Sequence, residues 1–536
     1  MIKAFQYLFF VALVSGCIIA CAKQGSPTGG PVDVEPPEFV NANPENFTTN
    51  FDKDEIRIYF DEYIKLEKPQ RQIIVSPPME PKTMITPLGT PRKYIKIEIL
   101  DTLQENTTYT VNFGQSIVDN NEGNPMPFFK YVFSTGSYID SLSVSGSVKS
   151  ALQKIPDDFI SVMLYEIDST YSDSIVYNEV PTYISYTNDS LNVFQIENIK
   201  EGTYKLIALK DQNRNYKFDP EQDKIAFLEK PIQVPVDTVF RLKLFKEILD
   251  FEAARPKHAT KQHLIFGYQG IADSAKIELL SEKPSDYEHR IIKDAEKDTL
   301  HYFFKPEMER DSLLFEISNE NYRDTLTVFL RELEKDSLQF KASSTGTIGF
   351  DENFELSANI PIVEQDTSLI SILDRDSLSV AFSSKIQPYE NDLVLEFEKG
   401  EAQTYQITIL PGAITDFFGK VNDTLSYRLR TKNISDYGIL SMNLQNVKNF
   451  PIIVQLVDLE GEIVQELQSG SETVFNFTNI EPGEYFVRII FDKNENGFWD
   501  TGNYLKNRQP ETVTYFPDTL QVRANWDVSE RFILKE

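Results

Sequence analysis

Two loops of this chain carry carboxylate and amide side chains at every second position, which is the spacing of an oxygen-donating calcium site. Loop two, residues 491–504, reads FDKNENGFWDTGNY, and loop one, residues 210–223, reads KDQNRNYKFDPEQD. The candidate ligands of loop two are Asp492, Asn494, Asn496, the Phe498 carbonyl oxygen and Asp500. Those of loop one are Asp211, Asn213, Asn215 and Asp219. The pattern therefore predicts a hard-cation site in each loop.

Both loops depart from the strongest calcium pattern. A calcium loop of the helical type needs a glycine at its sharp turn and a bidentate glutamate at its twelfth position. Loop two has Gly497 at the turn but Asn503 at position twelve, and loop one has Tyr216 and Gln222 at these places. We therefore expect either no cofactor or weak Ca²⁺ binding, on the order of millimolar. The alternative is two hairpin loops whose Asp and Asn side chains bond their own backbone.

The sequence lacks the common motifs of enzyme active sites. It contains no nucleophile elbow, phosphate-binding loop, dinucleotide fingerprint or cysteine–histidine cluster. We expect its four histidines to be surface or turn residues; they are His258, His263, His289 and His301. The chain is therefore predicted not to be an enzyme. A hydrolase with an unrecognised carboxylate site is the alternative, because 82 acidic residues make carboxylate pairs unavoidable.

The N-terminus has the pattern of a lipoprotein signal peptide. Lys3 precedes an apolar run, and two tetrads follow in which a small residue stands directly before a cysteine, VSGC and IIAC. We predict lipidation of Cys21, with Cys17 as the second choice; the alternative is an ordinary secretory signal. Cleavage before Cys21 would leave the mature chain with one cysteine, and so without a disulfide.

The stretch CAKQGSPTGGP resembles the mature start of Gram-negative outer-membrane lipoproteins that carry Ig-like domains. This resemblance implies anchoring by lipid in the outer membrane, on its periplasmic face or at the cell surface. The Gly, Pro and Ser residues after Cys21 lack apolar periodicity, and we interpret them as a flexible tether. Several acyl chains on one cysteine would give a stable anchor.

The composition predicts an all-β chain. Short runs such as EIRIYF, KYIKIEIL and TYQITIL alternate with period two and are rich in Ile, Tyr and Thr. A length of 536 residues is too large for one core, so several domains are expected. The formal charge of −29 disfavours nucleic acid as a partner, because phosphates require dense Lys and Arg.

Two kinds of segment occur twice in the sequence. Residues 103–136 match residues 397–432, and both resemble the bacterial Ig-like domain of S-layer-associated and cell-surface proteins. Residues 198–220 match residues 479–501, each with a G-x-Y entering a strand before an Asp/Asn loop. This second pair resembles transthyretin-like domains, also called carboxypeptidase-regulatory-like domains. The resemblances imply small β-sandwiches arranged in a duplicated pair.

These repeats predict a string of five β-sandwich domains after the signal peptide. The predicted boundaries are 1–20 for the signal peptide, 21–34 for the tether, 35–137 for the first Ig-like domain, 138–250 for a transthyretin-like sandwich, 251–344 for an unassigned sandwich, 345–432 for the second Ig-like domain and 433–536 for the second transthyretin-like sandwich.

The features together favour a non-catalytic, lipid-anchored scaffold that docks onto other outer-membrane or surface proteins. The alternative binding function is a surface glycan-binding or adhesion lipoprotein. Ig-like folds support either role by analogy only. A recurring Asp-Ser/Thr-aliphatic tripeptide also resembles an O-glycosylation sequence of secreted Gram-negative proteins, although the same tripeptide is a good strand start.

Overall fold

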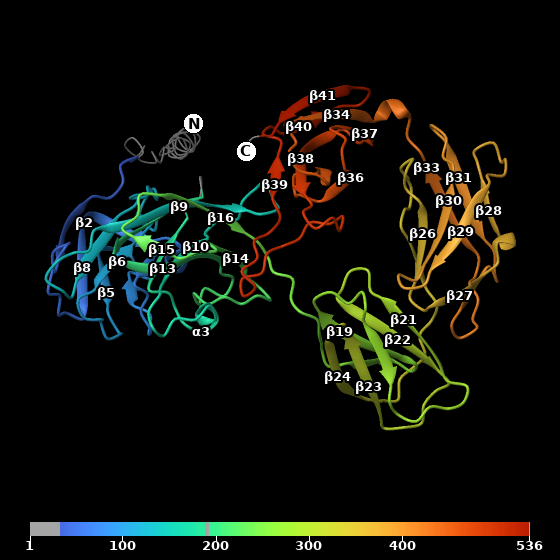
Figure 1. Cartoon of the computed structure of the whole chain (residues 1–536), viewed down its shortest axis with the longest axis horizontal. Helices are drawn as coiled ribbons and strands as arrows, with labels where there is room; N and C mark the ends of the chain where they lie inside the picture. Colours follow the sequence, from blue (N-terminus) through green and yellow to red (C-terminus); the bar gives the residue numbers. More distant parts are fainter. Residues whose placement is uncertain (1–32, 188–191, 535–536) are drawn as a thin grey trace, which may run out of the picture. The chain divides into compact units, whose positions relative to one another are not determined.

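The computed structural model of the chain describes residues 33–187 and 192–534 (Figure 1). Nearly all regular structure in this part is β-strand. The described helices are single turns: α2 (Pro69–Gln72), α3 (Ile175–Asn178), and the 3-10 turns Thr367–Leu369 and Ile434–Asp436. The all-β prediction is confirmed. The signal peptide and both candidate lipidation sites, Cys17 and Cys21, lie outside the described residues.

Strands form where the sequence alternates apolar and polar residues. In β2 (Glu55–Leu66), Ile56, Ile58, Phe60 and Ile64 are buried, while most residues between them face away from the core. Alternate side chains of a strand point to opposite faces of the sheet, so this pattern buries one face and exposes the other. The runs that predicted strands therefore also predicted which face packs inward.

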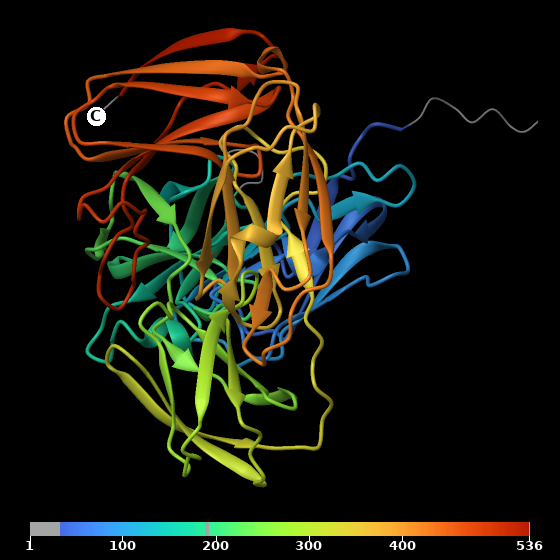
Figure 2. The same ribbon diagram turned by 90° about the vertical axis from the view of Figure 1, so that its right-hand side faces the viewer.

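The described strands fall into five consecutive groups, each with its own paired sheets, which we call the first to fifth sandwich (Figures 1 and 2). The chain is divided into two compact units. The first unit holds the described residues up to Ser143 together with Thr182–Ser185 and Ile196–Glu201, and the second holds the rest. Separate hydrophobic clusters fill the first, third, fourth and fifth sandwiches.

The first sandwich packs a sheet β1-β2-β5-β4, with β7 added to β2, against a sheet β3-β6-β8. Its strands are β1 (Phe39–Asn43), β2, β3 (Ile74–Ser76), β4 (Met84–Thr86), β5 (Arg92–Glu98), β6 (Thr108–Asn112), β7 (Ile117–Asp119) and β8 (Lys130–Ser134).

The fourth sandwich repeats this pairing strand by strand, except that the counterpart of β2 is split in two. Its sheets are β25-β26-β30-β29, β27-β32 and β28-β31-β33. The strands are β25 (Phe340–Ala342), β26 (Phe354–Ala358), β27 (Ile362–Gln365), β28 (Ile370–Leu373), β29 (Phe382–Gln387), β30 (Asp392–Phe397), β31 (Thr404–Ile409), β32 (Ile414–Asp416) and β33 (Leu425–Arg430).

The second sandwich contains sheets β11-β10-β13-β14, with β15 added to β13, and β12-β9-β16. In the second of these sheets, the central strand β9 and the edge strand β16 pair in parallel. The strands are β9 (Leu142–Ser150), β10 (Ser161–Glu166), β11 (Tyr183–Tyr186), β12 (Val193–Ile199), β13 (Gly202–Lys210), β14 (Lys224–Phe227), β15 (Ile232–Val234) and β16 (Val239–Leu244).

The fifth sandwich has the same topology as the second. Its sheets are β36-β35-β38-β39, with β40 added to β38, and β37-β34-β41, in which β34 and β41 are parallel. The strands are β34 (Gly438–Gln445), β35 (Ile452–Val457), β36 (Ile463–Ser469), β37 (Val474–Ile480), β38 (Gly483–Phe491), β39 (Val513–Tyr515), β40 (Leu520–Val522) and β41 (Asp527–Ile533).

The third sandwich has a pairing of its own, with sheets β17-β19-β22-β21, to which β18 adds at β19, and β20-β23-β24. Its strands are β17 (Glu252–Ala253), β18 (Lys257–Thr260), β19 (His263–Gln269), β20 (Lys276–Leu279), β21 (Glu288–Lys293), β22 (Thr299–Lys305), β23 (Ser312–Asn319) and β24 (Tyr322–Phe329).

The first and fourth sandwiches share hydrogen bonds as well as topology. In the first, the Tyr109 hydroxyl accepts from the Gln104 N–H at 2.9 Å, and in the fourth the Tyr405 hydroxyl accepts from the Gly400 N–H at 2.6 Å. Thr135 and its counterpart Thr431 likewise accept a backbone N–H, each at 2.9 Å. The repeat visible in the sequence therefore extends to the polar contacts that close each sandwich.

Candidate functional site

Loop two leaves β38 and uses its candidate ligands mainly to bond its own chain. The Asp492 carboxylate accepts the N–H groups of Asn496 at 3.2 Å and Gly497 at 2.8 Å. The side-chain amides of Asn494 and Asn496 donate to one oxygen of Asp500 at 2.7 and 2.8 Å. The structure thus brings Asn494, Asn496 and Asp500 together, and Asp492 caps the turn that contains the two asparagines.

The remaining candidate ligand of loop two is the backbone of Phe498. Its N–H donates to the Asn496 side-chain oxygen at 2.9 Å, and its side chain is 74% exposed. Asn496 is therefore both acceptor and donor inside the loop. This is the behaviour of an Asx turn, in which a short polar side chain replaces a backbone partner.

Loop one follows β13 and has the same internal bonding. The Asp211 carboxylate accepts from the N–H groups of Arg214 at 2.6 Å and Tyr216 at 2.8 Å. Asn213 donates to Asp219 at 3.5 Å, and the Asn215 side chain accepts from the Lys217 N–H at 2.9 Å.

The backbone at the turn is also shared between the loops. Tyr216 has a φ of 61°, close to the 80° of Gly497 at the equivalent position. The tyrosine therefore adopts the left-handed conformation that glycine adopts more cheaply.

A buried carboxylate closes each loop, and neither was among the predicted site residues. Asp223, fully buried, accepts the N–H groups of Gln212 at 2.8 Å and Asp219 at 2.9 Å. Burial raises the pKa of Asp223, although these two hydrogen bonds act in the opposite direction. The sequence signal was an acid just past position twelve of loop one.

Glu511 has the same role in the other loop. Its two oxygens accept the N–H groups of Lys493 at 2.7 Å and Asp500 at 3.2 Å. Glu511 lies eleven residues after Asp500, whereas Asp223 lies four residues after Asp219. Its separation from the loop explains why the sequence pattern did not reveal it.

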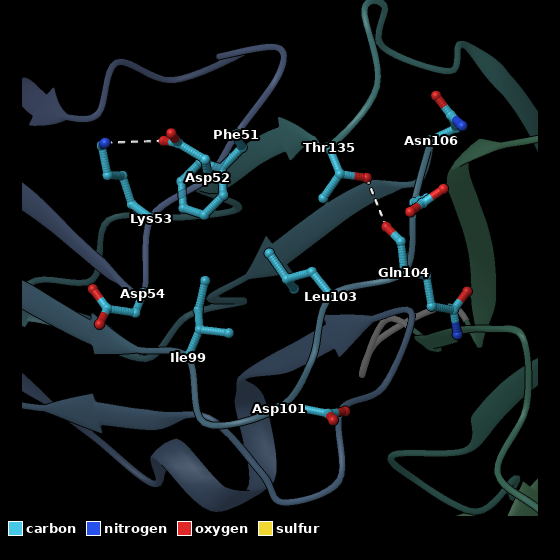
Figure 3. Close-up of a pocket in the computed structure, with 11 residues that line it drawn as sticks. Phe51, Asp52, Lys53, Asp54, Ile99, Asp101, Leu103, Gln104, Asn106 and Thr135 are labelled. Carbon is cyan, nitrogen blue, oxygen red and sulfur yellow. Dashed lines mark hydrogen bonds and ion pairs between the residues drawn. The ribbon is translucent and has the colours of Figure 1, made fainter.

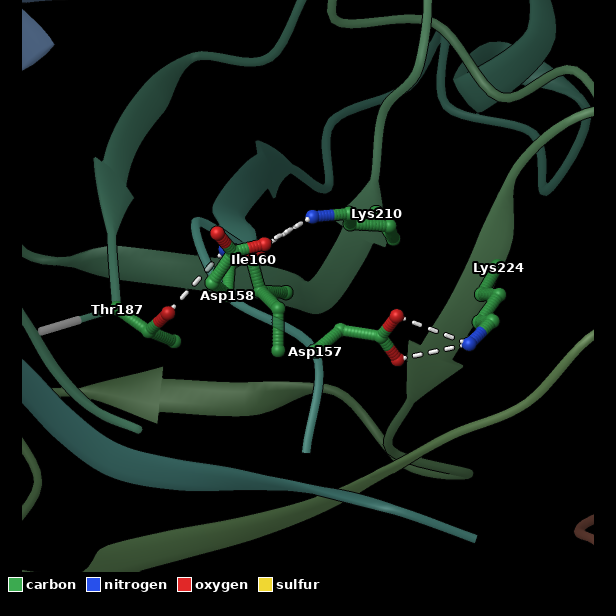
Figure 4. Close-up of polar contacts among 6 residues, drawn as sticks. All are labelled: Asp157, Asp158, Ile160, Thr187, Lys210 and Lys224. Atoms are coloured by element: carbon green, nitrogen blue, oxygen red, sulfur yellow. Dashed lines mark hydrogen bonds and ion pairs between the residues drawn. The ribbon is translucent and has the colours of Figure 1, made fainter. Parts of the chain in front are cut away.

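Two lysines flank loop one and fix its ends, as Figure 4 shows. Lys210, the last residue of β13, pairs with Asp158 at 2.7 Å. Lys224, the first residue of β14, contacts both oxygens of Asp157 at 2.9 Å. These pairs and the capping carboxylates give the loop a structural role in joining two neighbouring strands.

A metal role for the loops stays a prediction. In the described part of the chain, no group of three or more His, Cys, Asp or Glu side chains is arranged to hold a metal ion. Hard cations such as Ca²⁺ take six to eight oxygen ligands, and here most of the loop oxygens already accept a hydrogen bond. The chemistry that the loops perform in this arrangement is backbone capping.

The histidines depart in part from the sequence expectation. His263 is not a surface residue: it lies buried at the start of β19 and stacks on Phe303 with ring centroids 4.2 Å apart. Its Nε2 is 2.9 Å from Nδ1 of His301, whose Nε2 is 3.1 Å from Asp294. Burial, and then the neighbouring histidines, lower the pKa of His263 to about 3. His263 lies on the face of β19 opposite to the core residues Leu264 and Phe266, so its cover comes from Phe303 of the neighbouring strand β22.

The first and fourth sandwiches each have a surface hollow. The hollow of the first sandwich, of about 620 Å³, is lined by Phe51, Asp52, Asp54 and Asp101, among others (Figure 3). That of the fourth, of about 650 Å³, includes Phe350 and Asp351, and neither is lined by histidine or cysteine. Both sandwiches have a Phe-Asp pair in the lining of the hollow, so the hollow is a feature of the fold that the two sandwiches share.

The hydroxyl residues of the Asp-Ser/Thr-aliphatic tripeptides are accessible at every described site. Nine are exposed and two are half-buried, and the twelfth, Ser190, lies outside the described residues. The eleven are Thr102, Ser141, Ser174, Thr238, Thr299, Ser312, Thr325, Ser337, Ser377, Thr424 and Thr519. Glycosylation of these sites stays a prediction.

No helix in residues 33–187 and 192–534 has the length and apolar character required to cross a bilayer.

Comparison with known proteins identifies one part of the chain. Residues 33–135 match the family described as bacterial Ig-like domain, which confirms that resemblance for the first sandwich. No curated protein matches the sequence.

Among solved structures, the S-layer protein rSbsC(31-844) is 12% identical, with 90% of this chain and 66% of that chain covered and a TM-score of 0.17. The Bacillus anthracis TIE protein is 11% identical, with 95% and 76% covered and a TM-score of 0.14. The I9–I11 tandem from titin is 11% identical, with 52% and 100% covered and a TM-score of 0.12. The chain spans about two thirds of the length of the S-layer chains that it matches.

Proposed function

We propose that this chain is a non-catalytic, lipid-anchored scaffold of the bacterial cell envelope, which docks onto other outer-membrane proteins. The observation that carries the proposal is the duplicated pair of sandwiches: the strand pairing of the first and second recurs in the fourth and fifth. Repeated sandwich domains present sheet edges and loops to neighbours without a deep reaction cleft. The bacterial Ig-like match over residues 33–135 supports a role at the cell envelope.

The domain division that accompanies this proposal follows the sequence repeats. It places Ig-like domains at 35–137 and 345–432, transthyretin-like domains at 138–250 and 433–536, and an unassigned domain at 251–344. The identical topology of the second and fifth sandwiches supports one family for both. The transthyretin-like assignment itself rests on the G-x-Y and Asp/Asn loop pattern.

A glycan-binding surface protein is the second candidate, and one feature of the first sandwich favours it. On the outer face of the β2–β5 pair, the rings of Tyr59 and Tyr94 lie 5.9 Å apart. Arg57 and Arg92 lie over the Tyr94 ring at 5.8 and 5.5 Å. Tyrosines with one apolar face and one polar group suit sugar rings. Retention on an envelope-polysaccharide column that is lost in Tyr94→Ala would favour this candidate.

The anchoring part of the proposal is tested by cell fractionation. In the wild-type chain and in Cys17→Ser, we expect the protein in the outer-membrane fraction, radiolabelled by palmitate. In Cys21→Ser, acylation and signal cleavage should both fail. If Cys21→Ser is still processed and membrane-bound while Cys17→Ser is not, the anchor is Cys17. If palmitate labels neither the wild type nor either variant, the chain is not a lipoprotein.

A further inference from the structure

The connection that contains loop two has an insertion that loop one lacks. In the second sandwich, residues 220–222 separate Asp219 from the closing Asp223, whereas in the fifth, residues 501–510 separate Asp500 from the closing Glu511. Both closing carboxylates accept the same two backbone N–H groups of their loops. Residues 501–510 are therefore inserted into a loop whose capping hydrogen bonds are the same in both sandwiches. We call this insertion the strap.

The strap packs against the second sandwich, within the same compact unit of the chain. Tyr504, only 2% exposed, meets the ring of Phe227 edge-on, with centroids 5.2 Å apart. Its backbone N–H donates to the Glu247 carboxylate. Gln509 donates to the Phe227 carbonyl oxygen at 3.0 Å. An aromatic side chain buried this fully is the typical anchor of a protein interface.

The start of the strap approaches the second sandwich more closely still. The Thr501 hydroxyl, 2% exposed, donates to the Lys246 carbonyl oxygen at 2.6 Å. A Cβ on Gly502 would lie 2.5 Å from the Phe245 ring, so this contact requires glycine. Backbone and side chains of the strap are thus fitted to a defined surface at the end of β16.

A second patch lies outside the strap. The Tyr515 hydroxyl donates to the Leu152 carbonyl oxygen at 2.7 Å. The Lys154 ammonium donates to the carbonyl oxygens of Phe516 and Pro517 at 2.9 and 2.7 Å and lies 4.4 Å from the centre of the Phe486 ring. The interface therefore includes polar contacts outside the strap as well as those that the strap makes.

We infer that the strap is a docking element by which the fifth sandwich binds the second sandwich of the same chain. The partner is thus the earlier copy of the same fold, and the insertion present only in the later copy makes the contact. Because the two copies are joined directly, the segment 251–432 between them is held at both ends. This inference is independent of lipid anchoring and of any external partner.

The exposure of the Lys205 side chain depends on this contact. Lys205, on β13 of the second sandwich, is 5% exposed, and its ammonium lies 5.4 Å from the ring centre of Phe227 and 5.7 Å from that of Tyr504. Burial lowers the pKa of Lys205. Since Tyr504 covers this group, removal of the strap should open it to reagents in water.

The test is lysine acylation of the full-length protein, followed by mass spectrometry. Lys341, whose side chain is 81% exposed, is the internal reference. In the wild type, we expect Lys205 to react at least about tenfold more slowly than Lys341, because it must first be uncovered by local opening. Tyr504→Ala should raise the Lys205 rate several-fold, whereas Leu505→Ala, at a 59% exposed neighbour, should not.

A second variant removes the strap in another way, so that the test remains valid if Tyr504→Ala does not fold. Residues 501–510 are replaced by Pro-Glu-Gln, the natural connection of loop one, which keeps Asp500 and Glu511 in place. This variant should melt as a folded protein and expose Lys205. If Lys205 reacts as fast as Lys341 in the wild type, or stays protected in the folded replacement variant, the strap does not dock and the inference is wrong.

Discussion

Asp223 and Glu511 occupy equivalent positions in the two duplicated loops, although they differ in type and in distance from the loop start. If Asp211 and Asp492 are position one, each closing carboxylate accepts the N–H groups of positions two and nine. The longer glutamate reaches these groups across a connection that is seven residues longer. The geometry of the loop was thus retained while its sequence length changed.

This relationship predicts that each closing carboxylate holds its loop shut. Asp223→Ala should remove two hydrogen bonds from backbone N–H groups to a carboxylate, at a cost of about 1–3 kcal/mol in local stability. The amides of Gln212 and Asp219 should then exchange with solvent about tenfold faster or more. Hydrogen exchange measured by mass spectrometry on loop one checks this, with the exposed Glu221→Ala as control. Equal exchange in all three proteins would show that Asp223 is not a cap.

The bonding of the loops also predicts their response to calcium. Because the oxygens of Asp492 and Asp500 already accept hydrogen bonds, the melting temperature in about 5 mM CaCl₂ should equal that in the same concentration of MgCl₂. Asp492→Ala should lower it in either salt, since it uncaps the turn. A calcium-specific rise that Asp500→Asn abolishes would instead establish a metal site in loop two.

Asp119 in the first sandwich predicts an acid-sensitive turn. Burial acts to raise its pKa, but four backbone N–H groups, of residues 121–124, hold the pKa below the ordinary value. A carboxyl with a depressed pKa stabilises the fold above its unfolded pKa of about 3.9 and loses this contribution as the pH falls through the folded value.

The matched comparison is with Asp416 of the fourth sandwich, whose carboxylate accepts from the N–H groups of Phe418 and Lys420. Asp119→Ala should therefore lower the melting temperature at pH 7 more than Asp416→Ala does. The difference should shrink as the pH falls below about 3.9 and through the lowered pKa of Asp119, where the wild type loses this stabilisation. A larger loss for Asp416→Ala at pH 7 would contradict the role given to the four hydrogen bonds.

His263 predicts a second pH effect, in the third sandwich. Its folded pKa of about 3 lies below the ordinary value of about 6.5, so the unfolded chain binds its proton first. Above about pH 6.5, His263 is neutral in both the folded and the unfolded chain and does not lower stability. As the pH falls from there toward 3, only the unfolded chain binds the proton, which lowers the free energy of unfolding by at most about 5 kcal/mol. His263→Phe should flatten this dependence, as followed by amide exchange in β19. An unchanged slope would mean that His263 titrates normally.

Local sequence patterns predicted strands and repeats well, because side-chain alternation and turn residues are properties of neighbouring residues. EIRIYF became the first half of β2, and the matched segments became matched sandwiches. Contacts between distant residues were beyond this reasoning: nothing near Tyr504 indicates that it packs on Phe227, which precedes it by 277 residues. The burial of His263 was missed because it lies off the core face of β19 and is covered by Phe303, which follows it by 40 residues.

The scaffold proposal depends on a constant partner in the envelope, and crosslinking in intact cells tests it most directly. Full-length tagged protein is crosslinked, extracted and quantified with its companions by mass spectrometry. The account predicts one outer-membrane protein recovered in a fixed, near-stoichiometric ratio. That ratio should persist in Tyr94→Ala, which alters only the aromatic face of the first sandwich. Recovery of the chain alone, together with its retention on envelope polysaccharide, would contradict the scaffold role.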